Sequence, residues 1–167
     1  YIQEIKNIDF HYGQIEVEGY CILFSGSPLI HRPQDLEINY LLEAFDEAGT
    51  IYTISQEVTK GQRFLIIGRD ILTIMLYSAT VKKGTQNDCY IVGILDQKSV
   101  GSFQKKEITE ILTDFVDHIY ITDIMNPMKA VQNLKRNEKE SFDTTIICED
   151  VQGTETISVL MTKEKGH

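Results

Sequence analysis

Residues 33–119 carry the most restrictive feature of this sequence, a fixed order of amphipathic and apolar segments. A proline-led amphipathic segment (33–48) precedes a run of apolar strand candidates (51–95), and a second amphipathic segment (103–119) closes the series. A helix, several short strands and a closing helix are typical of a small domain in which helices cover a sheet. We therefore expect a scaffold that presents surfaces and performs no chemistry.

The spacing of the apolar residues assigns these segments to a fold class. The connections are short, which favours hairpins and antiparallel pairing, and the expected strands are 20–25, 63–67, 71–81 and 89–95. Helices are expected at 35–48, ended by Gly49, and at 103–119, where apolar residues recur every three or four positions. The sequence thus predicts an α+β fold, with a central antiparallel sheet flanked by helices on its faces.

The two ends of the chain are less strongly patterned. The first 19 residues are interpreted as a short strand pair that turns near Gly13, although their isoleucine spacing also suits a short helix. Asn126 and Pro127 predict the start of a third helix, which a hairpin follows at 144–161. We place one domain at 1–122 and a C-terminal helix-plus-hairpin extension at 123–167, packed on the same domain.

Composition excludes several classes of protein. The 167 residues are 42% hydrophobic and 25% charged, as in one globular domain, and no apolar run approaches the roughly 20 residues that span a bilayer. The formal net charge of −9 argues against nonspecific nucleic-acid binding and disfavours contact with membrane phosphoinositides. Widely spaced Cys21, Cys89 and Cys148 predict buried free thiols and a cytoplasmic location rather than a disulfide framework or a metal site.

Motifs that carry chemistry are absent from the sequence. There is no phosphate-binding glycine motif, no metal-ligand spacing and no nucleophile motif, so we expect no cofactor, no metal and no catalytic residue. Gly26 and Gly68 stand alone and are interpreted as turn glycines. Glu149 and Asp150 are interpreted as a charged strand edge that discourages aggregation.

Charge placement is the exception in this acidic chain. Lysines concentrate between the last expected strands and the closing helix: Lys82, Lys83, Lys98, Lys105 and Lys106. Arg69 lies in a turn of the same expected sheet. These residues are either ordinary solvated side chains or a patch that steers an acidic protein partner, and the sequence leaves both interpretations open.

The order of these pieces resembles the profilin family, in particular divergent members such as the archaeal ones. The segments that carry the resemblance are 33–49, 60–72, 79–84, 90–95 and 100–106. It covers about residues 20–119 and rests on their order, because no single motif is diagnostic. The resemblance implies a non-catalytic, cytoplasmic and cytoskeleton-associated protein that binds monomeric actin, regulates filament assembly and is itself a monomer.

The resemblance also implies two binding surfaces. The actin-facing surface would comprise Arg69, Tyr77, Lys82, Lys83, Lys98, Gly101, Gln104 and Lys105. Profilins also bind proline-rich peptides on aromatic side chains, for which this chain offers Tyr12 and Tyr120 and no tryptophan. We therefore expect polyproline binding to be weak or absent.

Two alternatives come from other functional classes. The same strand–helix–strand order occurs in roadblock and longin domains, which act as adaptors for small GTPases and trafficking complexes and often dimerise. A small-molecule sensor domain of the GAF or PAS kind would need an internal pocket, which no sequence feature announces.

Overall fold

The computed structural model describes residues 1–10, 14–20, 22, 47–101 and 103–167, and the chain divides into two compact units. In the first unit (residues 1–41), β1 (Ile2–Asp9) pairs antiparallel with β2 (Gln14–Gly19). This confirms the predicted strand pair, while its expected turn at Gly13 lies outside the described residues. None of the helices described in the chain is long and apolar enough to cross a membrane.

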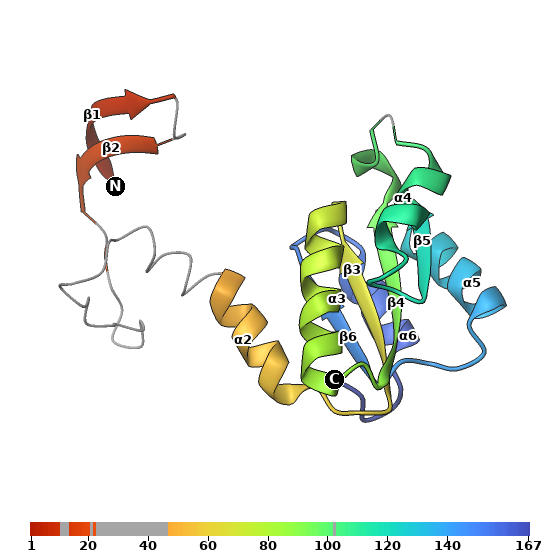
Figure 1. Ribbon diagram of the computed structural model, residues 1–167. Coiled ribbons are helices and arrows are strands. Elements are labelled where there is room, and N and C mark those ends of the chain that lie inside the picture. Colours follow the sequence, from red (N-terminus) through yellow and green to blue (C-terminus); the bar gives the residue numbers. More distant parts are fainter. Residues whose placement is uncertain (11–13, 21, 23–46, 102) are drawn as a thin grey trace. The chain divides into compact units, whose positions relative to one another are not determined.

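The second unit (residues 42–167) alternates helices and strands (Figure 1). In chain order its elements are α2 (Glu47–Glu57), β3 (Gln62–Gly68), α3 (Ile71–Thr85), β4 (Cys89–Asp96), η1 (Gln97–Ser99), α4 (Lys105–Leu112), β5 (His118–Thr122), α5 (Pro127–Asn137), β6 (Thr144–Ile147) and α6 (Thr154–Met161). The four strands form one sheet in the order β5-β4-β3-β6, and every pair in it is parallel. After each of β3, β4 and β5, the chain therefore passes back through a helix before the next strand begins at the same edge of the sheet.

Alternating side chains of the central strands divide the core into two clusters. Phe64 and Ile66 of β3 pack in one cluster with residues of α3 and α4, while Leu65 and Ile67 pack in the other with residues of α5 and α6. All four side chains are fully buried, as expected for a parallel strand covered on both faces. The result is a three-layer arrangement, with α3 and α4 on one face and α5 and α6 on the other.

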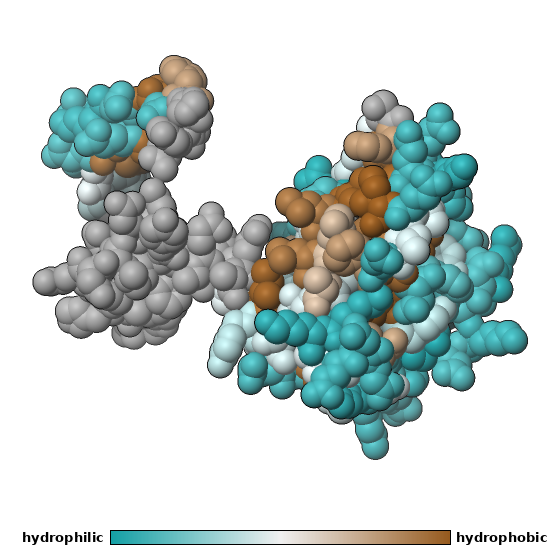
Figure 2. All heavy atoms as spheres, viewed as in Figure 1, coloured by the Kyte–Doolittle hydropathy of each residue, from teal (hydrophilic) through white to brown (hydrophobic). Residues whose placement is uncertain are grey.

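Helix α3 covers the centre of its face, yet it is apolar beyond the side that meets the sheet. Ile74 and Val81 are fully buried against the strands, whereas Leu72 is 73% exposed. Figure 2 shows apolar side chains gathered on the face of this unit where α3 runs. Asp70 caps the helix and Gln86 ends it in a left-handed conformation, with φ of 56°.

The predicted α+β class, with helices on the faces of a central sheet, is confirmed. Strands at 63–67 and 89–95 are confirmed within β3 and β4. The predicted antiparallel pairing of this sheet is wrong, because 71–81 forms the helix α3 rather than a strand. A helical crossover joins β3 to β4, and such a crossover makes the two strands parallel.

Three further predictions need correction. The closing helix ends at Leu112, and the last part of its expected apolar stripe lies in the following turn and in β5. The expected hairpin at 144–161 is a strand followed by a helix, β6 and α6, while the helix start at Asn126 and Pro127 is confirmed by α5. Gly49 lies inside α2 instead of ending a helix.

Other predictions lie largely outside the described residues. The helix at 35–48 and the strand at 20–25 fall mostly on residues that the structure does not describe. The division at residues 122 and 123 falls between β5 and α5 and stays a prediction.

Candidate functional site

The carboxyl ends of the four parallel strands meet at one edge of the sheet. β3 is joined through α3 to β4 on one side and pairs with β6 on the other, so the chain order reverses between β3 and β6. In open α/β sheets, ligands bind in the crevice outside the carboxyl ends of the strands at such a reversal. We call this edge, at Gly68, Asp96, Thr122 and Ile147, the carboxyl edge.

The turn from β3 to α3 lies at the centre of the carboxyl edge, and two carboxylates accept hydrogen bonds from its residues. The Thr73 backbone N–H donates to Asp70 Oδ1 at 2.8 Å, and Thr73 Oγ1 donates to Asp70 Oδ2 at 2.9 Å. From the end of β6, Glu149 Oε1 accepts the Arg69 backbone N–H at 3.3 Å, and Glu149 Oε2 lies 3.8 Å from Arg69 Nε. The backbone N–H groups of Arg69 and Thr73 therefore already have carboxylate partners.

A hollow of about 440 Å³ opens beside the end of β6. Glu149, Asp150 and Glu155 line it together with Cys148. Burial raises the pKa of the Cys148 thiol to about 12, and the nearby carboxylates of Glu149 and Asp70 act in the same direction. This part of the carboxyl edge therefore disfavours an added negative charge.

Asp96 ends β4 and is almost completely buried, with 5% of its surface exposed. Its Oδ1 accepts the Lys98 backbone N–H at 3.3 Å and so caps η1. In dinucleotide-binding sheets of this strand order, an acidic residue near this position accepts a hydrogen bond from a ribose hydroxyl. Asp96 matches that role by its place in the fold.

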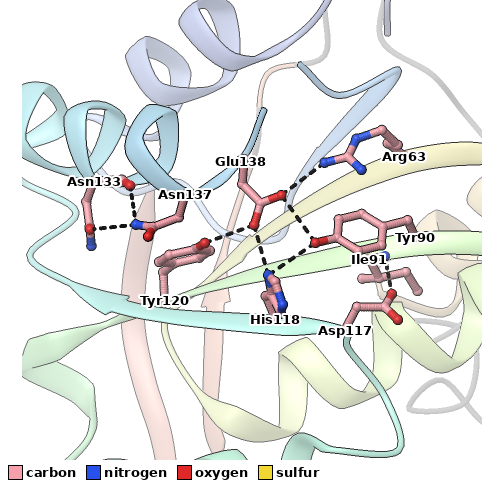
Figure 3. Close-up of polar contacts among 9 residues, drawn as sticks. All are labelled: Arg63, Tyr90, Ile91, Asp117, His118, Tyr120, Asn133, Asn137 and Glu138. Atoms are coloured by element: carbon pink, nitrogen blue, oxygen red, sulfur yellow. Dashed lines mark hydrogen bonds and ion pairs between the residues drawn. The ribbon is translucent and has the colours of Figure 1, made fainter. Parts of the chain in front are cut away.

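A second polar cluster lies at the opposite, amino edge of the sheet and surrounds Glu138, just after α5 (Figure 3). Only 3% of the Glu138 side chain is exposed, and Arg63 Nη2 of β3 lies 3.0 Å from its Oε2. Tyr90 donates its hydroxyl to Oε2 at 3.2 Å, Tyr120 donates to Oε1 at 2.9 Å, and His118 Nδ1 lies 3.1 Å from Oε1. The carboxylate thus ties three strands to the end of α5.

The protonation states in this cluster follow from the contacts. Burial acts to raise the pKa of Glu138, but hydrogen bonds from His118, Tyr120 and Tyr90 hold that pKa below its ordinary value. Burial and the Glu138 carboxylate raise the pKa of both Tyr90 and Tyr120. At neutral pH the cluster is therefore an ionised carboxylate that accepts from protonated hydroxyls.

The Glu138 cluster is best explained as a structural clamp. Its residues lie at the amino edge of the sheet, away from the edge where open α/β sheets bind ligands. His118 is backed by a carboxylate and its side chain is 57% exposed, an arrangement that orients an imidazole. The same Nδ1 also lies 3.1 Å from the Tyr90 hydroxyl, so the ring is held within the clamp.

The structure distributes the residues of the predicted actin surface over both edges. Arg69 and Lys98 lie at the carboxyl edge, and Gly101 and Lys105 line one hollow with Gln97. Lys82 and Lys83 lie in the last turn of α3, which is at the amino edge. The remaining members are Tyr77, which is 94% buried on α3, and Gln104, which caps α4. The structure therefore does not gather the eight residues on one surface.

The two predicted polyproline-binding residues have separate outcomes. Tyr12 lies outside the described residues. Tyr120 donates its hydroxyl to Glu138 and packs against the core cluster on the α5 and α6 face. As a binding residue Tyr120 stays a prediction.

Sheets of this strand order commonly hold a nicotinamide dinucleotide, whose pyrophosphate binds at a G-x-G-x-x-G turn before the first helix. In this chain Gly68 fills the first position, and a Cβ there would come within 3.1 Å of Ile74 Cδ1. Asp70 and Thr73 occupy the second and third glycine positions, and the Asp70 carboxylate holds the helix start. Asp96 lies at the strand end where a ribose-binding carboxylate is expected, but the turn does not fit the pyrophosphate.

Comparison with known proteins identifies two similar dehydrogenases. The chain is 28% identical over 166 residues to the L-erythro-3,5-diaminohexanoate dehydrogenase of Fusobacterium nucleatum, and 27% identical over 167 residues to that of Acetoanaerobium sticklandii. Each match covers 99% of this chain and 46% of the relative, so the chain spans about half the length of these curated relatives. No family model matches the chain.

These relatives overturn the functional predictions made from the sequence. Both are oxidoreductases, so the resemblance to profilins is wrong, and with it actin binding, cytoskeletal association and a non-enzymatic role. The roadblock or longin adaptor gains no support either. Sequence reasoning also missed Asp70, Asp96 and Glu138; for Asp96 the signal was an acidic residue directly after a buried apolar strand.

Proposed function

We propose that this chain is part of an oxidoreductase that acts on an amino-acid substrate with more than one ammonium group. The observation that carries the proposal is the 28% identity to a diaminohexanoate dehydrogenase across 99% of the chain. The strand order supports it by analogy, because this architecture commonly serves dehydrogenases.

The charge of the carboxyl edge suits such a substrate. Primary amines with pKa values of about 10 are protonated at neutral pH, and Glu149, Asp150 and Glu155 line the hollow beside β6. Carboxylates placed there would bind and orient an ammonium group. Because the β3–α3 turn does not fit a pyrophosphate, the proposal assigns no step to a nicotinamide cofactor.

Binding and turnover test the proposal separately. We expect L-erythro-3,5-diaminohexanoate to bind saturably in calorimetry, whereas hexanoate, which lacks the ammonium groups, should not bind. Glu155→Gln should weaken binding about tenfold, or roughly 1.4 kcal/mol, and Glu164→Gln, an exposed residue near the end of the chain, is the matched control.

Turnover is measured with a panel of electron acceptors, namely NAD⁺, NADP⁺ and a redox dye. We expect oxidation of the diamino acid with at least one of them, detected by mass spectrometry of the product. If the substrate neither binds nor is oxidised with any acceptor, the proposed function is wrong.

The location proposed from the cysteines is the cytoplasm. Cys89 and Cys148 are free thiols in the structure, and a reducing compartment preserves such thiols. Mass spectrometry of alkylated protein from gently lysed cells would test this, and a disulfide at either residue would contradict it.

A further inference from the structure

We infer that the first βα turn of this sheet, between β3 and α3, does not seat a dinucleotide pyrophosphate, although the sheet has the strand order on which such a site is built. The inference concerns the β3–α3 turn alone and does not depend on the proposed function. β3 is the strand from which the chain order runs outward in both directions. The turn after β3 is where a pyrophosphate would lie.

The first reason for exclusion is shape. The glycine motif lets the backbone approach the pyrophosphate and lets the helix pack closely on the strand. Gly68 preserves the close packing, since any Cβ there would crowd Ile74. At the second motif position Asp70 has φ of −127° and ψ of 164°, an ordinary N-cap conformation with its side chain turned onto the helix start. The side chain therefore stands where backbone alone would be needed.

The second reason is that two N–H groups of the turn already donate to carboxylates of this chain. A helix start binds phosphate through its free N–H groups and the positive end of the helix dipole. Here the Thr73 N–H donates to Asp70 at 2.8 Å, and the Arg69 N–H donates to Glu149 at 3.3 Å. Each carboxylate accepts a backbone N–H that a phosphate oxygen of a bound dinucleotide would otherwise accept.

The third reason is charge. Arg69 is the one cation in the turn, and Glu149 Oε2 lies 3.8 Å from its Nε. The formal charges of Arg69, Asp70 and Glu149 sum to one negative charge. A pyrophosphate bridge would add two more negative charges beside them, which is unfavourable at such short separations.

Restoring the motif provides the test. In the Asp70→Gly/Thr73→Gly double variant, glycines stand at positions 68, 70 and 73, which is the G-x-G-x-x-G spacing, and one carboxylate is gone. The matched control is Thr113→Gly/Asp114→Gly, which makes the same two residue changes after α4, in the connection to β5 at the other edge of the sheet. NAD⁺ and NADH binding to the full chain is measured by calorimetry, and the fold by circular dichroism.

We expect wild type and control to bind NAD⁺ or NADH more weakly than about 1 mM, and the double variant to bind at least tenfold more tightly than wild type. Saturable micromolar binding to wild type would overturn the inference, whatever the variants do. A double variant that keeps the wild-type spectrum and gains no affinity would also overturn it. If the double variant unfolds, Asp70→Gly alone takes its place, with a gain of at least threefold expected and no gain counting against the inference.

Discussion

Removing the Glu138 carboxylate should strongly destabilise the second unit. Glu138→Ala leaves the hydroxyls of Tyr90 and Tyr120 and the guanidinium of Arg63 without their shared acceptor. Breaking a buried ion pair costs about 3–5 kcal/mol. Because 20% of the Arg63 side chain is exposed, water compensates in part, and we expect the lower end, about 3 kcal/mol.

Urea unfolding at pH 7, followed by circular dichroism, measures this loss. With a slope near 2 kcal/mol per molar urea, a loss of about 3 kcal/mol lowers the midpoint by roughly 1.5 M. Glu138→Gln keeps an acceptor for the tyrosines and should cost about 1–2 kcal/mol. Glu140→Gln, an exposed residue two positions away, is the control. A Glu138→Ala midpoint equal to that of the control would refute the clamp.

Four further outcomes follow from the pKa shifts, glycine conformations and burial of several described residues. The pKa values of Glu138 and Asp143 are lowered in the folded state, so both carboxylates stabilise the fold at any pH above their unfolded pKa values of about 4. This stability should be lost as the pH falls below about 4, and urea midpoints measured against pH would record the loss. Gly153→Ala places a Cβ 2.6 Å from the Ile124 carbonyl oxygen at φ of 103°, and should lower the free energy of unfolding by about 2–3 kcal/mol. Gly61→Ala has φ of 74° but open space around the Cβ, and should lower it by about 1 kcal/mol in the same assay. Leu112→Ala should cost about 2–5 kcal/mol and more than Phe115→Ala, because Leu112 is fully buried and Phe115 only partly; the reverse order would contradict the placement of the core. Iodoacetamide at pH 8 should modify Cys148 at least tenfold more slowly than an unhindered peptide thiol, because its pKa is raised to about 12, and peptide mass mapping would detect equal rates if this is wrong.

The sequence allowed β3 and β4 to be predicted because both are short, continuous apolar runs bounded by polar residues. The same reasoning failed at 71–81, where a continuous apolar run suits a buried strand and a buried helix equally. Length and the N-cap at Asp70 favoured the helix. A strand at 71–81 implies hairpin connections on both of its sides, so it excludes the parallel sheet and the carboxyl edge that the helix α3 creates.

The residues of the Glu138 cluster could not be found from local pattern. Glu138 lies in a charged stretch that reads as a linker, and its partners Arg63, Tyr90 and His118 are 20 or more positions away. Only the three-dimensional pairing of β3, β4 and β5 brings them together. Gly68 was likewise interpreted as a turn glycine, whereas it is the last residue of β3 and pairs with Leu95 of β4; that place followed only from the strand order.

The backbone amides from Gly68 to Thr73 offer the most direct measurement of the central claim, that carboxylates of this chain occupy the place of a dinucleotide phosphate on a doubly wound sheet. In ¹⁵N-labelled wild-type protein we expect these amide resonances to stay unmoved as NAD⁺ is added to millimolar concentration. In the Asp70→Gly/Thr73→Gly variant the amides of the same turn should shift and saturate. A saturating NAD⁺-dependent shift of the Arg69 and Thr73 amides in the wild-type protein would contradict the account.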